Sequence, residues 1–408
     1  MNLTFRLAWR NIFRNGRRTF LTCLLLASSL IALVLTDGVM KGMMALMIET
    51  TTRTFSGEAQ VHKQHFRDAF DVDLFIEDTD EITTQLAADK SVEAFTVRTM
   101  SGSMVSSADN ITGAVLWGVD ADTETRVSKL KEALIEGDYL TGLDNEMLIG
   151  QEMADLLEVD LGDRIVVTLS QVNGGELSQA LFRLSGIFKF GMRELDNSMV
   201  FVNLQQSRQI LGMDRGAHEI AFNFVDSEQA INPDIQIIKT LSSNKNIEAA
   251  TWATLQPQMS AMLGMIDYSL IIIGSILFII AGLGIINSMF MSIYERIYEF
   301  GVAMAIGTRP GQMITLIMAE AFFLALLSVI GGMIVAYFLS NHFSVVGIPI
   351  GEMEFEGISI QNNIKTILDV SQFTVFPLAV IALTMVAAIY PALFTARIVP
   401  SEALHKSL

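Results

Sequence analysis

Residues that could do chemistry are few and scattered. Five histidines are spread along the chain, and His62 and His65 stand three apart. The surrounding Ala59-Gln60-Val61-His62 predicts a strand, in which such positions point to opposite faces, so a shared metal is not expected. Cys23 is the single cysteine, which excludes a disulfide or a Cys-based metal site within one chain. We therefore predict no catalytic and no metal site, and a chain that is not an enzyme.

Neither an acidic cluster nor a phosphate-binding loop gives evidence for an enzyme. One acidic cluster comprises Asp71, Asp73, Glu77, Asp78, Asp80 and Glu81. Such a cluster is typical of a solvated face, and weak calcium binding is the alternative. The sequence contains no Gly-x-x-x-x-Gly-Lys-Ser/Thr, the loop that cradles nucleotide phosphates in many ATPases. We expect no cofactor in this chain itself.

Four long apolar stretches are the elements that must position any functional residues of the chain. They run over 20–36, 268–294, 310–351 and 370–396, and Glu320 is the one charge before residue 351 in the third. About 20 apolar residues cross a bilayer as a helix, and Gly38 and its neighbours can lengthen the first stretch. The pattern predicts an α-helical membrane protein with four transmembrane helices.

Charge sets the expected orientation. Residues 1–19 carry five arginines and no acid, whereas the loop at 340–372 has one lysine against four acids. Positive flanks favour the cytoplasm, so both termini are expected inside. The block 44–265 holds 16 basic and 34 acidic residues and is expected outside. Its acidity argues against a nucleic-acid partner, because phosphates would be repelled.

The N-terminal segment has helical periodicity. Its apolar positions are Phe5, Trp9, Ile12 and Phe13, beside a stripe of arginines. Such a helix suits the inner membrane interface, with a plain topology signal as the alternative. The arginines expected at that interface are Arg10, Arg14, Arg17 and Arg18.

The outer block is predicted to be a large α/β domain of two subdomains, inserted between the first and second spans. Strands are expected at 165–172, 181–190 and 199–202, with Gly174-Gly175 as a hairpin turn between the first two. Helices are expected at 122–136, 152–157 and 204–211. A β-rich lobe is predicted at about 110–205, with the flanks 50–109 and 206–262 paired in space.

Two membrane features suggest function. An ionised Glu320 costs on the order of 3 kcal/mol if it faces lipid, so it should face a helix interface or the cytoplasmic side, with snorkelling as the alternative. Methionines line the outward ends of the first two spans, where they are candidates for a lipid-accepting cleft between subunits. The alternative is packing between the two stalks. The methionines are Met40, Met43, Met44, Met47, Met259, Met262 and Met265.

The connection between the second and third spans is a short amphipathic helix. Residues 292–307 continue the second span and break at Gly307, with Pro310 close behind. Its charges are Glu295, Arg296 and Glu299. An element of this size forms no domain, but it can dock into a groove on another protein.

These motifs resemble the FtsX/MacB-type permeases of ABC transporters. Three segments carry the resemblance. The first is the opening Ala8-Trp9-Arg10-Asn11-Ile12-Phe13-Arg14-Asn15, and the second is Glu295-Arg296 with Glu299-Phe300-Gly301 and Ala305-Ile306-Gly307. The third is the closing Pro391-Ala392, Ala396-Arg397 and Pro400-Ser401-Glu402-Ala403-Leu404. Four short motifs in the outer block resemble the branch of the Lol lipoprotein-releasing permeases: Gly118-Val119-Asp120, Gly137-Asp138-Tyr139-Leu140, Leu148-Ile149-Gly150 and Leu161-Gly162-Asp163. Met304 departs from the pattern, because many relatives carry a basic residue there.

The resemblance implies a permease subunit that works with a cytoplasmic ABC ATPase dimer, which binds ATP and Mg. It also implies a second permease copy or a paralogue, membrane lipids, and a periplasmic lipoprotein carrier or adaptor, in a bacterial inner membrane. The residues it assigns to ATPase coupling are Glu295, Arg296, Glu299, Gly301, Ala305 and Gly307. Extraction or trafficking of lipoproteins or another lipidated substrate is the favoured expectation. The alternatives are MacB-like efflux with a periplasmic adaptor and FtsX-like signalling to a cell-wall hydrolase.

The expected organisation follows from these elements: a cytoplasmic amphipathic helix (1–19), transmembrane helix 1 with an outer stalk (20–45), a MacB-like periplasmic domain (46–262), transmembrane helix 2 (263–293), a cytoplasmic coupling helix (294–311), transmembrane helix 3 (312–340), an extracytoplasmic loop (341–371), transmembrane helix 4 (372–395) and a cytoplasmic tail (396–408).

Overall fold

The computed structural model describes residues 3–232, 234–349, 353–355, 358–360 and 363–399. The chain divides into two compact units. Unit 1 comprises Met1–Ala45, Leu263–Pro349 and Asn362–Leu408, and unit 2 comprises Leu46–Met262 and Ile350–Gln361. The closing motif Pro400–Leu404 lies outside the described residues.

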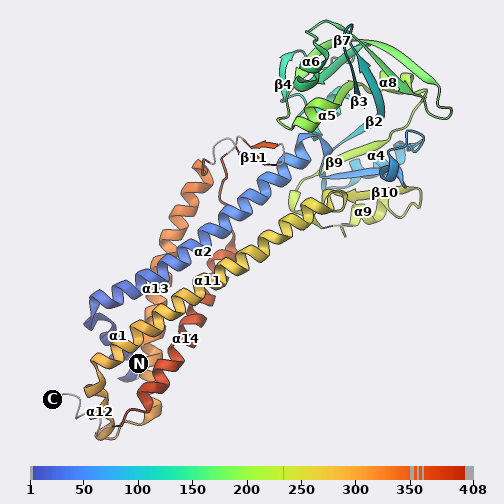
Figure 1. Ribbon diagram of the computed structural model, residues 1–408. Coiled ribbons are helices and arrows are strands. Elements are labelled where there is room, and N and C mark those ends of the chain that lie inside the picture. The colour runs from blue at the N-terminus through green and yellow to red at the C-terminus, as the bar shows by residue number, and fades with distance from the viewer. Residues whose placement is uncertain (1–2, 233, 350–352, 356–357, 361–362, 400–408) are drawn as a thin grey trace. The chain divides into compact units, whose positions relative to one another are not determined.

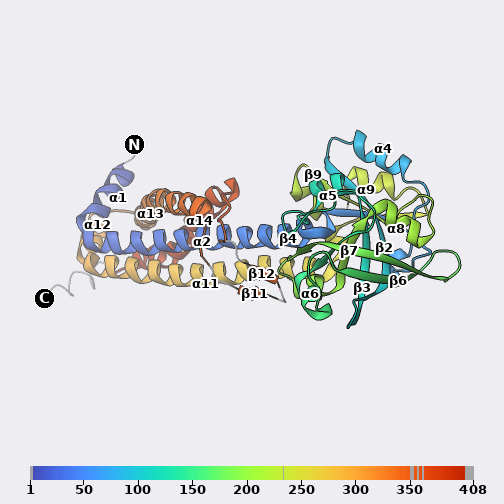
Figure 2. The same cartoon turned by 90° about the horizontal axis from the view of Figure 1, so that it is seen from above.

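Unit 1 is a bundle of long helices that lie side by side in both views (Figures 1 and 2). Its elements are α1 (Leu3–Arg14), α2 (Gly16–Thr51, as far as Ala45), α11 (Pro257–Glu295, from Leu263), α12 (Ile297–Ala305), α13 (Pro310–Val346), the 3-10 turn η3 (Val370–Phe373) and α14 (Val375–Ala396). Four stretches are long and apolar enough to cross a membrane: Gly16–Ser56, Pro257–Glu295, Pro310–Val346 and Val370–Ala396. The predicted four-helix membrane architecture is confirmed.

The bundle core is built from one face of each long helix. Leu30 on α2, Ile285 on α11, Ala321 on α13 and Ala388 on α14 are each at most 1 % exposed and belong to one apolar cluster. The outward faces remain apolar and exposed, as at Leu283 with 62 %. Apolar residues all round a helix are typical of a helix that is solvated by lipid.

An extended segment, 363–369, runs between α2 and α13. Gly42 makes the closest approach, since a Cβ there would lie 1.8 Å from the backbone oxygen of Lys365. One turn earlier, the Gly38 carbonyl accepts a hydrogen bond from the Ile367 N–H at 3.0 Å. On the other side, the Thr366 hydroxyl donates to the Ser340 carbonyl at 2.7 Å. Glycines on α2 therefore admit a second backbone that ties two helices together.

Charged groups pin the same segment. The Lys41 ammonium lies 2.7 Å from an Asp369 oxygen and 3.3 Å from Asp37. Gln372 donates to the buried Asp37 carboxylate at 2.7 Å. Hydrogen bonds from Lys41 and Ser371 lower the pKa of Asp369, so this carboxylate stays ionised in the pair.

We expect Gly42→Ala to destabilise unit 1 by about 1–3 kcal/mol, because the new methyl overlaps backbone that must shift. The matched control is Gly331→Ala on α13, where an added Cβ meets nothing within 4 Å. Thermal unfolding of the full chain in nanodiscs measures both. Equal unfolding temperatures for the two variants would contradict the tight crossing.

Unit 2 is an α/β domain. Its helices and turns are η1 (Thr52–Ser56), α3 (Phe66–Ala69), α4 (Asp80–Ala88), α5 (Ala121–Val127), α6 (Gln151–Leu157), α7 (Arg193–Ser198), α8 (Leu204–Leu211), η2 (Ser227–Ile231), α9 (Gln236–Leu241) and α10 (Trp252–Leu255). Its strands are β1 (Ala59–Lys63), β2 (Val92–Ser106), β3 (Ile111–Val119), β4 (Leu134–Gly137), β5 (Glu146–Gly150), β6 (Arg164–Ser170), β7 (Leu177–Phe188), β8 (Met199–Asn203), β9 (Glu219–Phe224), β10 (Ile247–Thr251) and the hairpin β11 (Met353–Phe355) with β12 (Ile358–Ile360).

One sheet joins the predicted lobe and its flanks. Its strand order is β10-β1-β9-β2-β3-β8-β5-β7-β4, and β6 pairs with β2 and β7. The first half of β2 pairs with β9 and its second half with β6. The flanks therefore do pair in space, through β1, β2, β9 and β10. The 15-residue strand β2 continues from the flanks into the lobe. The two subdomains are therefore joined by a shared strand, and no linker marks the boundary between them at β2.

Local predictions in unit 2 are confirmed where turn or capping chemistry is clear. The hairpin at Gly174-Gly175 forms, with β6 antiparallel to β7 and Gly175 at φ +64°. The strand at 199–202 is β8, and the helices at 152–157 and 204–211 are α6 and α8.

The helix predicted over 122–136 is wrong in its second half. It is capped by Asp120, whose side chain accepts from the Asp122 and Thr123 N–H groups, but it ends at Val127. Leu130 is then fully buried, and residues 134–137 form β4 against β7. Tertiary burial and strand pairing outweigh the local helical pattern here.

His218 is a buried neutral imidazole. Its Nδ1 accepts from the Met100 N–H at 3.1 Å, and its Nε2 lies 2.9 Å from the Val72 carbonyl, to which it donates. Burial lowers the pKa of His218 from 6.5 to about 4, because protonation of Nδ1 would place a charge in the core and break the bond from Met100.

Stability of unit 2 is expected to fall as the pH drops from 6.5 towards 4. In that window the unfolded His218 binds a proton and the folded one does not, which favours unfolding by on the order of 3 kcal/mol in total. Burial also lowers the pKa of His62, which acts in the same direction. His218→Asn keeps an acceptor for Met100 and should flatten the dependence. Unfolding followed by tryptophan fluorescence at about pH 7.5 and 5 tests this, and an equal pH dependence in both proteins would contradict it.

Candidate functional site

The first two helices meet at a break on Asn15. The Asn15 carbonyl accepts from the N–H groups of Arg18 and Thr19, both at 3.1 Å. The Thr19 hydroxyl donates back to the Ile12 carbonyl at 2.5 Å. These bonds fix the angle between α1 and α2.

The helix α1 packs on α13. Ala8 and Ile12 are buried at helical spacing, and the rings of Phe5 and Trp9 meet Phe323 edge-on, with centroids 6.3 and 5.3 Å apart. The predicted amphipathic helix therefore forms, and part of its apolar face covers another helix of the bundle.

The predicted coupling helix is interrupted at its start. The Arg296 N–H bonds to the Ile293 carbonyl, one residue short of the α-helical partner, and Arg296 has φ −114° and ψ 12°. A new helix, α12, then begins at Ile297. Gly307, at φ +102°, ends the connection, and Pro310 opens α13. The expected continuous helix over 292–307 is thus two helices with a bend at Arg296.

Both ends of the bend are held by the N-terminal arginines. Arg14 makes a bidentate ion pair with Glu299, with Nη1 to Oε2 at 3.0 Å. Hydrogen bonds from Arg14 lower the pKa of Glu299, so it remains ionised. Arg18 pairs with Glu295 at 2.5 Å, and the Asn15 amide donates to the same carboxylate at 2.7 Å.

Glu320 faces a helix interface. Its side chain lies on α13, is 7 % exposed, and accepts from the Asn11 amide at 2.6 Å and from Arg296 Nη1 at 2.9 Å. Arg296 is 9 % exposed, and its guanidinium lies 4.8 Å from the Phe300 ring and reaches Glu299 at 3.4 Å. The snorkelling alternative does not describe this geometry. The role of Glu320 in coupling stays a prediction.

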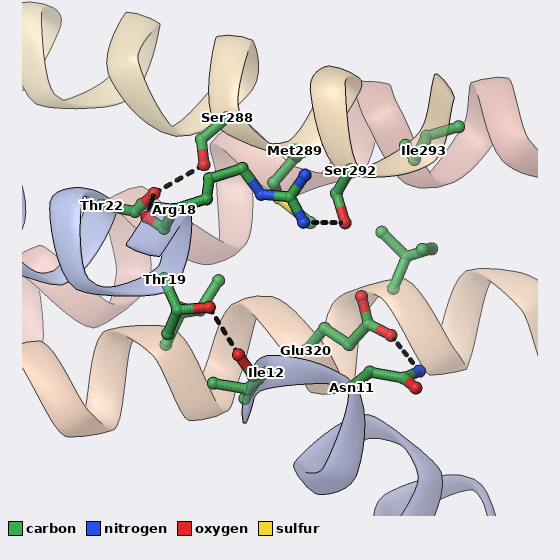
Figure 3. Close-up of a pocket in the computed structure, with 12 residues that line it drawn as sticks. Asn11, Ile12, Arg18, Thr19, Thr22, Ser288, Met289, Ser292, Ile293 and Glu320 are labelled. Atoms are coloured by element: carbon green, nitrogen blue, oxygen red, sulfur yellow. Dashed lines mark hydrogen bonds between the residues drawn. The ribbon is translucent and has the colours of Figure 1, made fainter. Parts of the chain in front are cut away.

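A small polar cavity lies beside this network (Figure 3). It measures about 30 Å³ and is lined by residues of α1, α2, α11 and α13. Thr22 and Ser288 bond across it at 2.6 Å, and Arg18 Nη2 donates to Ser292 at 2.9 Å. The volume suits one water molecule, to which polar lining residues such as Thr22, Ser288 and Glu320 could bond. Water-mediated polar contacts between helices can break and re-form at a lower cost in free energy than the repacking of a dry apolar core.

The structure brings together six of the predicted residues: Arg14, Arg18, Glu295, Arg296, Glu299 and Glu320. We call these six, with Asn11 and Asn15, the junction network. Arg10 and Arg17 are exposed and form no ion pair within the described part of the chain. Gly301 is buried, whereas Ala305 and Gly307 are exposed at the end of α12. Sequence reasoning did not single out Asn11 and Asn15, although their i, i+4 spacing places both on one helical face.

The methionines of the predicted cleft are divided between the two units. Met40, Met43, Met44 and Met265 belong to unit 1, and Met47, Met259 and Met262 to unit 2. Met265 is 67 % exposed, and the others are partly buried. The cleft therefore stays a prediction.

Two family models match the chain. Residues 19–251 match the MacB-like periplasmic core domain, and residues 271–400 match the FtsX-like permease C-terminal model. The first match alone covers more than half of the chain.

Known proteins with similar sequences include permeases and exporters. The lipoprotein-releasing system transmembrane protein LolC of Xylella fastidiosa (strain Temecula1) is 24 % identical over 309 residues, which are 72 % of this chain and 73 % of that protein. The pyoverdine export ATP-binding/permease protein PvdT of Pseudomonas aeruginosa is 37 % identical over 81 residues, 20 % of this chain and 11 % of that protein. Among solved structures, the periplasmic region of MacB from Actinobacillus actinomycetemcomitans has a TM-score of 0.34 and 14 % identity, with 50 % of this chain and 94 % of that chain covered.

Proposed function

The chain belongs to the family of FtsX-like permeases with a MacB-like periplasmic core domain, and from this premise we propose that it transmits the ATP-driven motion of a separate ATPase to that domain. It is an ABC transporter permease and a multi-pass membrane protein. In the proposal both termini and α12 lie in the cytoplasm, because the arginines cluster before the first span.

The junction network is the observation that supports this function best. The short helix α12 presents Tyr298, and the residue after its end, Ile306, is also exposed; these apolar side chains, 48 and 81 % exposed, can dock on a partner. The same helix is tied through Glu299 to α1 and through Arg296 to α13. A push on α12 would therefore move the inner ends of several spans together. ATP and Mg would be bound by the partner ATPase dimer, whose closure supplies the push.

The substrate we propose is a lipoprotein or another lipidated molecule, extracted from the outer leaflet. The similarity to LolC over 72 % of the chain supports this substrate class. The transporter would contain a second permease, either another copy or a paralogue, and would pass its substrate to a periplasmic carrier or adaptor.

Export in the manner of MacB is the second candidate. The match of residues 19–251 to the MacB-like core domain and the local similarity to PvdT favour it. In that case the MacB-like domain would bind a periplasmic adaptor, and the substrate would be a small molecule or a peptide.

Purification of the complex distinguishes the two. The tagged chain is isolated from native membranes in mild detergent, and its partners and lipids are identified by mass spectrometry. We expect an ABC ATPase together with acyl-modified protein. An adaptor without acylated protein would favour export, and the absence of any ATPase would overturn the proposed function. A tagged chain with Tyr298→Asp and Ile306→Asp is the control, because it should lose the ATPase and keep its partners in the membrane.

A further inference from the structure

A cavity of about 360 Å³ lies within unit 2. Its walls come from η1, β1, α3, the strands β2 and β3, and α7 with the start of β8. The volume falls within the range of small-molecule sites, about 300–1,000 Å³, and near its lower end. It can therefore hold one chain-like or ring-like group.

One wall is apolar and rigid. The rings of Phe55 and Trp117 meet edge-to-face with centroids 4.8 Å apart, and both side chains are buried, as is Met100. The Arg98 guanidinium lies 4.0 Å from the Phe55 ring, which holds that ring in place.

A second part of the lining is apolar and adaptable. Met192, Leu195 and Met199 are partly exposed and line the cavity from α7 and its two ends. Methionine side chains are unbranched and polarizable, so they can repack around chains of different shape. An apolar lining of this kind favours an apolar guest.

The polar residues of the lining include Arg67, whose guanidinium forms no ion pair among the described residues. Glu219 lines the cavity, but Arg98 already pairs with it at 2.7 Å, and His62 is neutral because burial lowers its pKa. Arg67 is half-buried and makes one hydrogen bond to another described residue, to the Leu255 carbonyl at 3.3 Å. Its guanidinium has further donors that can meet an anion. Arg193 and Glu194 also line the cavity; they are adjacent, exposed and opposite in charge, so together they add no net charge to the lining.

We propose that this cavity binds the acyl chain of a single-chain amphiphile whose anionic head contacts Arg67. The apolar walls take the chain, and the free guanidinium takes a carboxylate or phosphate. The volume fits one chain better than two. The proposal deepens the proposed function and rests on it for the biological source of the chain, which is either a free fatty acid or a chain of a membrane lipid.

Fluorescence of Trp117 tests the proposal in the full chain in nanodiscs. Trp9→Phe and Trp252→Phe leave Trp117 as the one tryptophan. Bromine quenches indole fluorescence only at close range, so a brominated fatty acid should quench Trp117 and the quenching should saturate. A second arm uses nanodiscs made with brominated phospholipid and no fatty acid. Quenching in the first arm alone identifies a free fatty acid, and quenching in the second identifies a membrane lipid.

Two variants locate the site. Arg67→Gln should weaken saturable binding about tenfold, because it removes a charge-assisted contact. Met199→Phe should reduce binding by filling the adaptable wall. Arg126→Gln removes an exposed charge from α5, outside the cavity, and should change nothing. If the Trp9→Phe, Trp252→Phe background fails to fold, the saturable quenching of the unmodified chain must disappear in Trp117→Phe.

Quenching that fails to saturate, or that is equal in Arg67→Gln, reflects partition into the bilayer and overturns the site, as does its absence in both arms. The assay contains no ATPase and no lipoprotein. Its failure therefore leaves the proposed function standing, whereas saturable binding without acylated protein in the purified complex would retain the cavity and refute lipoprotein release.

Discussion

Glu320→Leu should leave membrane insertion intact and lower transport and permease-stimulated ATPase activity about tenfold. Insertion is preserved because the third span becomes more apolar. Activity falls because the substitution removes the carboxylate that joins Asn11 of α1 to Arg296 at the bend. Arg296, only 9 % exposed, then loses its closest ion-pair partner. A loss of coupling on the order of 1–3 kcal/mol corresponds to roughly 5–150-fold.

Two companion variants separate charge from packing. Glu320→Gln retains an acceptor for Asn11 without the charge, so its activity should fall between wild type and Glu320→Leu. Thr315→Val changes an exposed polar residue of the same helix, whose hydroxyl donates to the Gly311 carbonyl within α13, and should be neutral. Unchanged transport and ATPase activity in a fully inserted Glu320→Leu protein would refute a role for the junction network in coupling.

Arg98→Met should destabilise unit 2 by about 3–5 kcal/mol. The Arg98 side chain is fully buried, and its guanidinium bonds Glu124 in bidentate fashion, at 2.7 and 2.9 Å, and Glu219 at 2.7 Å. Burial alone would lower the pKa of Arg98, but Glu124 and Glu219 raise it above its ordinary value. Removing the cation leaves two buried carboxylates without their common partner. Urea unfolding followed by tryptophan fluorescence measures the loss.

A triple variant distinguishes charge imbalance from lost volume. Arg98→Met combined with Glu124→Leu and Glu219→Leu removes the whole charge cluster and should recover part of the stability, since buried ion pairs can often be replaced by apolar residues. Lys90→Met, an exposed change in the same domain, is the control. If Arg98→Met unfolded at the same urea concentration as wild type, the proposed importance of this cluster would be wrong.

Much of the fold was readable from the sequence because the signals are local. Four apolar stretches predicted the long helices, and the Gly174-Gly175 turn predicted the pairing of β6 with β7. The prediction of a helix at 122–136 was wrong in its second half, because Leu130 is buried by residues distant in sequence. Burial of that kind is decided after the sheet assembles and leaves no periodic pattern.

The junction network was visible in its parts but not in its pairing. Arg14 and Glu299 are 285 positions apart, and Asn11 and Glu320 are 309 apart. Each residue type was informative alone, as an interfacial arginine or an intramembrane acid. Which acid meets which arginine depends on helix packing, and the bend at Arg296 that brings Glu320 within 2.9 Å has no sequence marker such as glycine or proline.

Accessibility of Tyr298 to an impermeant thiol reagent tests the central claim most directly. A cysteine replaces Tyr298, 48 % exposed on α12, in a Cys23→Ser background, and a second protein carries cysteine at Leu177 of unit 2, 77 % exposed. If α12 receives the push of a cytoplasmic ATPase, intact cells should label only the Leu177 position, and permeabilised cells should label both. Labelling of the Tyr298 position in intact cells would place α12 outside and contradict the account.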